Sequence, residues 1–374
     1  MDKQKSVLIN TLKFITSLVL AGFVTTAAAT PPTPVDELLQ SMSDEQKAAQ
    51  LIMVYFASPE FTVKHEFGAV LIMQNMIKDA GKLSARLDKL QHQSSIGVLT
   101  AIDQEGGTVN RLKYLPGWKN TPSAATQSKW TDNKIYKHQK KVATKLNSLG
   151  ININLAPVLD PGKNHHNKPT LMGKKKRSFE HTPYDIASKA AVFIQAHQDK
   201  NVLTISKHFP GYDAENNSDH EIAISDASRN DLNNYIQPFW ALAPIVDGVM
   251  MSSIHYQNMT DRPAVLSPEM VNWAREIHPE KIIITDDLWG LALRSWINPV
   301  SAKRKKYPDK DFLKLTRMAL EAGNDMLMIT YPKKAVLMKK AIANWMKEDK
   351  NLHQQINQSV KRILSVKEKS GLLQ

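Results

Sequence analysis

Eight short apolar segments, separated by longer polar or amphipathic stretches, restrict the folds open to this sequence. They cover residues 50–56, 68–73, 98–103, 151–158, 202–208, 248–254, 281–286 and 325–330. Apolar runs of this length, bounded by turn residues, are typical of strands that are buried on both faces of a parallel sheet. We therefore expect eight β-strands in the interior of the protein.

Helical patterns lie between most of these segments. Apolar side chains recur with helical spacing in residues 184–200, and further helices are expected over 313–322, 335–347 and 352–369. Residues 43–46 carry a capping-box signature, which predicts the start of a short helix. The repeated alternation of strand and helix favours an α/β fold of the TIM-type (β/α)8 barrel class, although a doubly wound open sheet gives similar alternation.

The N-terminal segment has the pattern of an export signal. A start with three lysines is followed by an apolar run over residues 14–24 and by three alanines at 27–29. This order predicts a cleaved signal peptide over 1–29, followed by one barrel domain over 30–374. We expect an exported protein, periplasmic or secreted, with an uncleaved membrane anchor as the alternative.

Composition narrows the classes of partner and chemistry. The chain has no cysteine, which excludes disulfides, thiolate metal sites and cysteine nucleophiles. Its formal net charge is +13, and removal of residues 1–29 leaves +11. A basic balance favours anionic partners, and export makes a cell-envelope polymer a better fit than nucleic acid. The alternative is a basic surface without a specific partner; we expect a monomer that is not inserted in a membrane after signal cleavage.

Ionisable residues follow several of the expected strands. Asp103 ends the third, Asp160 follows the fourth, Lys207 and His208 end the fifth, and Asp286 ends the seventh. In a parallel barrel the carboxyl ends of the strands meet at one face, where active sites are found. Burying so many charges without partners is costly, so we predict a functional site at this face.

The polar segments also carry a family resemblance. In their colinear order they resemble glycoside hydrolase family 3, most closely its single-domain β-N-acetylhexosaminidases of peptidoglycan recycling. The matching segments extend over about residues 41–331 and comprise 101–107, 154–160, 177–179, 207–211, 261–268 and 284–288. The resemblance implies a barrel enzyme that hydrolyses O-glycosidic bonds and needs no cofactor.

The resemblance implies a retaining mechanism in two steps. Asp286 matches the catalytic nucleophile of the family, and its neighbour Asp287 is expected to be structural. The alternative for Asp286 is a paired carboxylate on the barrel rim. Sugar contacts are implied for a set of polar residues, namely Asp103, Arg111, Arg177, Lys207 and His208.

Three further polar residues have two interpretations each. Glu105 either takes part in the site or only braces the turn at Gly106 and Gly107. Asn154 and Asp160 are expected to be structural parts of the rim rather than ligands of the substrate. Carboxylates accept hydroxyl protons, so the chemistry alone does not decide between these interpretations.

The general acid/base is expected on the loop after the fifth strand. In the family it is a histidine, with an aspartate two residues earlier that orients it. Gapless spacing places His220 on the histidine and Ser218 on the aspartate, while a carboxylate stands next door at Asp219. Asp213 and Glu215 are other candidates for supporting the histidine, and an exposed His220 without a catalytic role is the alternative.

These features together predict an exo-glycosidase that removes terminal N-acetyl-β-glucosamine from peptidoglycan-derived or related sugars. One alternative is a β-glucosidase-like member of family 3, and another is a catalytically silent glycan-binding protein. We predict no metal site, because no ligand spacing completes the adjacent His165 and His166.

Overall fold

The computed structural model describes residues 33–179, 182–304 and 306–373. Residues 34–374 form one compact unit, which contains every element described below. The predicted signal peptide, residues 1–29, lies outside the described residues. None of the helices within the described ranges is long and apolar enough to cross a membrane.

Eight parallel strands form the centre of this unit, and each falls within one of the eight predicted segments or overlaps it. The strands are short and almost wholly buried, which explains their uninterrupted apolar sequences. Their bounds are β1 Ile52–Tyr55, β2 Ala69–Ile72, β3 Leu99–Ile102, β6 Ile153–Asn154, β7 Leu203–Phe209, β9 Gly248–Met251, β11 Ile282–Ile284 and β12 Leu327–Ile329.

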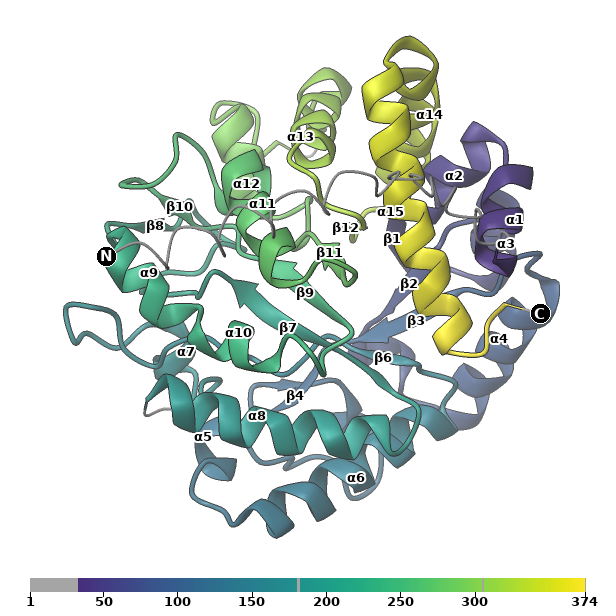
Figure 1. Cartoon of the computed structure of the whole chain (residues 1–374). Coiled ribbons are helices and arrows are strands. Elements are labelled where there is room, and N and C mark those ends of the chain that lie inside the picture. Colours follow the sequence, from purple (N-terminus) through teal and green to yellow (C-terminus); the bar gives the residue numbers. More distant parts are fainter. Residues whose placement is uncertain (1–32, 180–181, 305, 374) are drawn as a thin grey trace, which may run out of the picture. The chain divides into compact units, whose positions relative to one another are not determined.

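The strands close into a barrel. They pair in the order β11-β9-β7-β6-β3-β2-β1-β12, and every pair is parallel. A parallel bridge between Ile284 and Met326 joins the last strand to the first. Figure 1 shows the strands at the centre with helices around them. The barrel prediction is confirmed, and the open-sheet alternative is excluded.

Helices connect the strands and cover the barrel. The capping box at residues 43–46 is present, since Gln46 N donates to Ser43 Oγ and Ser43 N donates to Gln46 Oε1. The four predicted helices are confirmed as α8, α13, α14 and α15. The helices are α1 Pro34–Ser41, α2 Asp44–Gln50, α3 Pro59–His65, α4 Ala80–Gln93, α5 Ala124–Gln127, α6 Asp132–Ser148, α7 Leu171–Lys174, α8 Pro183–Gln198, α9 Arg229–Tyr235, α10 Gln237–Leu242, α11 Pro268–Ile277, α12 Leu291–Ile297, α13 Asp309–Glu321, α14 Pro332–Glu348 and α15 Lys350–Lys369.

Two small sheets supplement the barrel. The hairpin of β4 (Gln104–Gly106) and β5 (Val109–Asn110) follows β3 directly. The second sheet pairs β8 (Ile224–Ser225) with β10 (His255–Tyr256) in parallel, and thereby fixes the far end of the loop that leaves β7. Both sheets continue from barrel strands beyond their carboxyl ends, so they shape the face where the site was predicted.

Candidate active site

A cavity of about 500 Å³ opens at the carboxyl ends of the barrel strands. It brings together Asp286, all five predicted sugar contacts, Ser218 and Asp219. His220 is exposed and is not among the residues that line it. The lining also includes Tyr55, Leu71, Met73, Glu105, Val109, Leu171, Met172, Tyr212, Asn217, Met250, Asp287, Trp289, Gly290, Leu291, Arg294, Met328 and Thr330.

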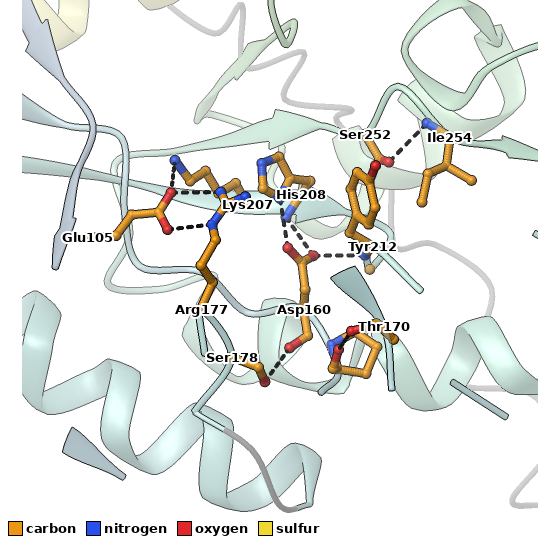
Figure 2. A network of polar contacts seen from close by, with 12 residues as sticks. Glu105, Asp160, Thr170, Arg177, Ser178, Lys207, His208, Tyr212, Ser252 and Ile254 are labelled. Atoms are coloured by element: carbon orange, nitrogen blue, oxygen red, sulfur yellow. Dashed lines mark hydrogen bonds and ion pairs between the residues drawn. The ribbon is translucent and has the colours of Figure 1, made fainter. Parts of the chain in front are cut away.

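Glu105 is the centre of an ion-pair cluster in one wall of the cavity. Arg177 binds it in a bidentate manner, with Nε 2.8 Å from Oε2 and Nη2 2.8 Å from Oε1. Lys207 Nζ lies 2.6 Å from Oε1 of the same carboxylate (Figure 2). Burial alone would raise the pKa of Glu105, but the Arg177 and Lys207 charges outweigh burial and hold this pKa below its usual range.

Asp103 extends the same cluster toward the cavity. Lys207 Nζ donates to Asp103 Oδ1 at 2.6 Å, and Arg111 Nη2 lies 3.5 Å from Oδ2. Burial opposes the ionised form, yet Lys207 and Arg111 lower the pKa of Asp103, and both carboxylates raise the pKa of Lys207. The cluster therefore keeps its charges at neutral pH and presents fixed donors and acceptors to a ligand.

Backbone geometry, rather than Glu105, determines the turn that follows. Gly106 and Gly107 have φ of 94° and 58°, in the region that favours glycine. A Cβ at Gly106 would lie 2.2 Å from the Pro122 carbonyl oxygen, so a side chain is sterically excluded there. Glu105 is therefore placed by this turn and spends its own carboxylate on Arg177 and Lys207.

Asp160 is wholly buried behind the cavity, where it orients His208. Its Oδ2 lies 2.7 Å from His208 Nδ1, while its Oδ1 accepts from His208 N and Tyr212 N at 2.8 Å each (Figure 2). With Nδ1 held by this carboxylate, Nε2 is the ring nitrogen left for the cavity. Asp160 thus acts on the site through His208, a role that the strand-end pattern did not reveal.

Asp286 and Asp287 differ sharply in their contacts. Asp287 accepts from Trp289 N and Thr330 N at Oδ1 and from the Thr330 hydroxyl at Oδ2. Asp286 Oδ1 accepts from Asp287 N, and within the described part of the chain Asp286 makes no ion pair. The carboxylate that the resemblance marks as nucleophile is therefore the one left free to react.

Burial and neighbouring charges act on both carboxylates. Burial raises the pKa of Asp286; the nearby His208 opposes this effect and the Asp219 carboxylate adds to it. The pKa of Asp287 rises to about 6, again mainly through burial. Asp286 thus has polar neighbours from two sides of the cavity, His208 from the barrel and Asp219 from the loop.

The opposite wall is the loop of residues 211–224. Tyr212 is buried beneath it, and its hydroxyl donates to Asn216 O and accepts from Ser218 N, both at 2.8 Å. Burial raises the pKa of Tyr212 to about 12, so this hydroxyl stays protonated and able to donate. The tyrosine that replaces a family histidine in this loop is thus a clamp on its tip.

The first turn of α12 holds the loop tip from the other side. Leu291 N donates to Asp219 O at 3.2 Å, and Ala292 N donates to Ser218 O at 3.3 Å. In this arrangement the side chain of Asp219 faces the cavity while that of His220 is exposed. Neither Asp219 nor Ser218 makes a side-chain hydrogen bond to His220 within the described structure.

Only one group of histidine and carboxylate side chains in the described ranges has the spacing of metal ligands. It consists of His165, His166 and Asp226. None of the three lines the cavity. The group lies on loops beside the far end of residues 211–224, next to β8.

A family profile and solved structures relate the chain to known proteins. The profile of the glycosyl hydrolase family 3 N terminal domain matches residues 43–366. A β-N-acetylhexosaminidase from Beutenbergia cavernae has a TM-score of 0.74 at 25% identity, covering 87% of this chain and 99% of that chain. A family 3 β-N-acetylglucosaminidase from Paenibacillus sp. FPU-7 has a TM-score of 0.76 at 24% identity, covering 89% and 63%.

Curated relatives agree in their names and differ in length. Beta-hexosaminidase A of Pseudoalteromonas piscicida is 24% identical over 83% of this chain, which spans only 54% of that protein. Beta-hexosaminidase LpqI of Mycobacterium tuberculosis is 26% identical over 72% of this chain and 75% of that protein. This chain thus spans about half of the first relative and three quarters of the second.

Proposed function

Because the chain belongs to glycosyl hydrolase family 3, we propose that it is a retaining exo-glycosidase that removes terminal N-acetyl-β-glucosamine. The observation that carries the proposal is the contrast between Asp286 and every other buried carboxylate of the cavity. Asp103, Glu105 and Asp287 are each held by cations or by several hydrogen bonds, whereas Asp286 is free of ion pairs. The names of the curated relatives and solved structures support the sugar specificity.

Asp286 carries the covalent step of the proposed reaction. Its carboxylate attacks the anomeric carbon while the bond to the leaving oxygen breaks, and a proton donor protonates that oxygen. Water then attacks the glycosyl ester from the same face and restores the free carboxylate, with overall retention. A position just beyond a barrel strand holds the nucleophile rigidly, which favours a geometry already close to attack.

The ion-pair cluster supplies recognition of the non-reducing sugar. Carboxylate oxygens of Asp103 accept from sugar hydroxyls, and the cations of Arg111, Arg177 and Lys207 donate to hydroxyl, ring or acyl oxygens. These side chains already hold one another in place, so little conformational entropy is lost when the sugar binds. His208 contributes Nε2, oriented from behind by Asp160.

The proton donor is assigned to the segment Ser218–His220. Asp219 is in the cavity in the arrangement described, and a second carboxylate opposite the nucleophile suits a retaining mechanism. His220 has the side chain whose ordinary pKa suits the task, but it reaches the cavity only if the loop tip turns away from α12. Such a turn breaks the bonds from Leu291 N and Ala292 N.

Two matched variants separate these donors. The donor's loss should slow hydrolysis about 100-fold or more for a poor leaving group, and much less for an activated aryl group that needs no protonation. Asp219→Asn and His220→Ala are each compared on both substrates, with azide added as an external nucleophile. The variant that shows the leaving-group dependence and is rescued by azide identifies the donor, while a uniform effect in both variants removes the segment from this role.

The substrate is placed outside the cytoplasm. The net charge of +13 and the export signal predicted over residues 1–29 both favour an anionic envelope polymer or fragments of it. We propose peptidoglycan-derived sugars as the substrate class and turnover of wall material as the role. Fractionation of cells that express the full chain tests the compartment, and recovery in the cytoplasm would contradict it.

A direct assay tests the activity itself. Turnover of an aryl N-acetyl-β-glucosaminide, lost in Asp286→Ala, is the expected result. Turnover of the aryl β-glucoside alone would instead support a β-glucosidase-like enzyme. Failure to turn over either substrate, with muropeptide binding retained, would replace the enzyme by a glycan-binding protein.

A further inference from the structure

Three side chains from two distant parts of the sequence converge beside the barrel rim. His165 and His166 lie on the loop that follows β6, and Asp226 comes directly after β8. His165 Nε2 lies 3.1 Å from Asp226 Oδ1, and His166 Nε2 lies 3.0 Å from Oδ2. Both imidazoles thus turn the same ring nitrogen toward one carboxylate.

The spacing of these atoms suits a bound ion. The ligand atoms of the three residues all lie within 4.8 Å of one another. Two ligands that each lie about 2.1 Å from a tetrahedral Zn²⁺ are about 3.4 Å apart. The observed separations of 3.0 and 3.1 Å therefore need only a few tenths of an ångström of movement to admit an ion. Access is open, because the side chains of His166 and Asp226 are about half exposed.

Buried polar groups back the first histidine. Its Nδ1 lies 3.4 Å from the Tyr235 hydroxyl and 3.8 Å from Asp213 Oδ2. Asp213 is buried, and its Oδ1 has no hydrogen-bond partner among the described residues. Metal-bound histidines usually have a carboxylate or another polar group at the second ring nitrogen, which fixes the tautomer. This arrangement therefore resembles a ligand set with its outer support.

The loop that carries the histidines is also fixed independently of Asp226. Asn164 Oδ1 accepts from His166 N at 3.1 Å and from Lys168 N at 3.0 Å. Asp226 is placed by β8, which pairs with β10. Both sides of the group are thus preorganised by backbone contacts, which lowers the cost of collecting three ligands around one ion.

We propose that His165, His166 and Asp226 bind a divalent transition-metal ion of the Zn²⁺ class, at a site separate from the catalytic cavity. Two imidazoles and a carboxylate suit Zn²⁺ and its neighbours rather than Mg²⁺ or Ca²⁺. Three protein ligands leave one position of the ion for water. The proposal rests on this geometry alone and does not depend on the glycosidase activity.

Titration with Zn²⁺ tests the site on the full chain without a histidine tag, after treatment with a chelator. Isothermal titration calorimetry should give one ion per chain, and the melting temperature should rise with Zn²⁺ because only the folded state presents the site. His166→Ala and Asp226→Asn should lose both effects. His92→Ala, on the exposed end of α4, should retain both.

Two outcomes would overturn the proposal. One is the lack of any binding tighter than millimolar in the wild-type chain. The other is binding that persists unchanged in His166→Ala and Asp226→Asn. Circular dichroism and the metal-free melting temperature of each variant are measured first, and Co²⁺ absorption in the wild type checks for imidazole ligands. A Zn²⁺ site that forms in a chain inactive on sugars would leave the proposal intact while removing the proposed function.

Discussion

The two walls of the cavity are built in different ways. In the barrel wall, the ion-pair cluster joins Asp103, Glu105, Arg111, Arg177 and Lys207 through buried charges. In the loop wall, residues 217–219 are held by one tyrosine hydroxyl and by backbone bonds to α12. Breaking the first wall costs buried charge, whereas breaking the second costs a few neutral hydrogen bonds. The molecule thus has a rigid side suited to recognising a sugar and an adjustable side suited to moving a proton.

The nucleophile between the walls should show the largest effect. Asp286→Asn removes the attacking carboxylate with little change in shape, and we expect kcat/KM to fall by about 10⁴-fold or more. Asp287→Asn is the matched control, because its Oδ1 can still accept from Trp289 N and Thr330 N. Steady-state kinetics on an aryl N-acetyl-β-glucosaminide compares the two. Equal losses in both variants would remove the distinction on which the mechanism rests.

The ion-pair cluster should be the next most sensitive part. Glu105→Gln leaves Arg177 buried with a neutral partner, and loss of one member of a buried pair costs about 3 kcal/mol of unfolding free energy. Urea denaturation measures this loss, and KM should rise because the sugar contacts lose their common anchor. The exposed pair of Glu60 with Lys89 is the control, since Glu60→Gln should leave stability nearly unchanged. A stable Glu105→Gln variant would show that the barrel wall is not rigid.

The sequence predicted the rigid wall better than the adjustable one. Each barrel strand is an apolar run buried on both faces, so its position was visible, although strands such as β6 are shorter than predicted. The charged strand ends then meet by the geometry of the barrel alone. All five predicted sugar contacts line the cavity for this reason.

Pairings between distant residues escaped the sequence. Asp160 and His208 are 48 positions apart, and nothing local showed that one orients the other. Asp226 completes a cluster with His165 only because β8 pairs with β10, and both strands are too short to give a pattern. The side-chain direction of His220 was equally hidden, because a loop follows its contacts rather than a period. Its catalytic role stays a prediction.

Tyr212 should control the adjustable wall. Tyr212→Phe removes the hydroxyl that joins Ser218 N and Asn216 O, and a lost neutral hydrogen bond of about 1 kcal/mol corresponds to about fivefold more frequent opening of the loop tip. Hydrogen exchange of the peptide that contains residues 216–219 measures this opening. Tyr307→Phe, which loses a hydroxyl bond to Arg294 O instead, is the control and should leave that peptide unchanged. Unchanged exchange in Tyr212→Phe would mean that α12 alone holds the tip.

The smallest effect concerns the electrostatic link between the walls. Burial raises the pKa of Asp286, and the Asp219 carboxylate adds to that rise. Attack needs the ionised carboxylate, so kcat/KM should decline on the acid side at a pH above the ordinary aspartate pKa of about 3.9. Removing the negative charge in Asp219→Asn lowers the pKa of Asp286, and the acid limb should move to lower pH whatever happens to the absolute rate.

The control for this shift is a carboxylate on the same loop but outside the cavity lining. Glu215 pairs with Lys174 at 2.7 Å, so Glu215→Gln should leave the acid limb in place. If Asp219→Asn also leaves it in place, the loop tip does not stay beside Asp286 in solution, and α12 does not hold it there. A shift confined to Asp219→Asn places the charge of the adjustable wall next to the nucleophile, as expected if the loop positions the proton donor before the sugar arrives.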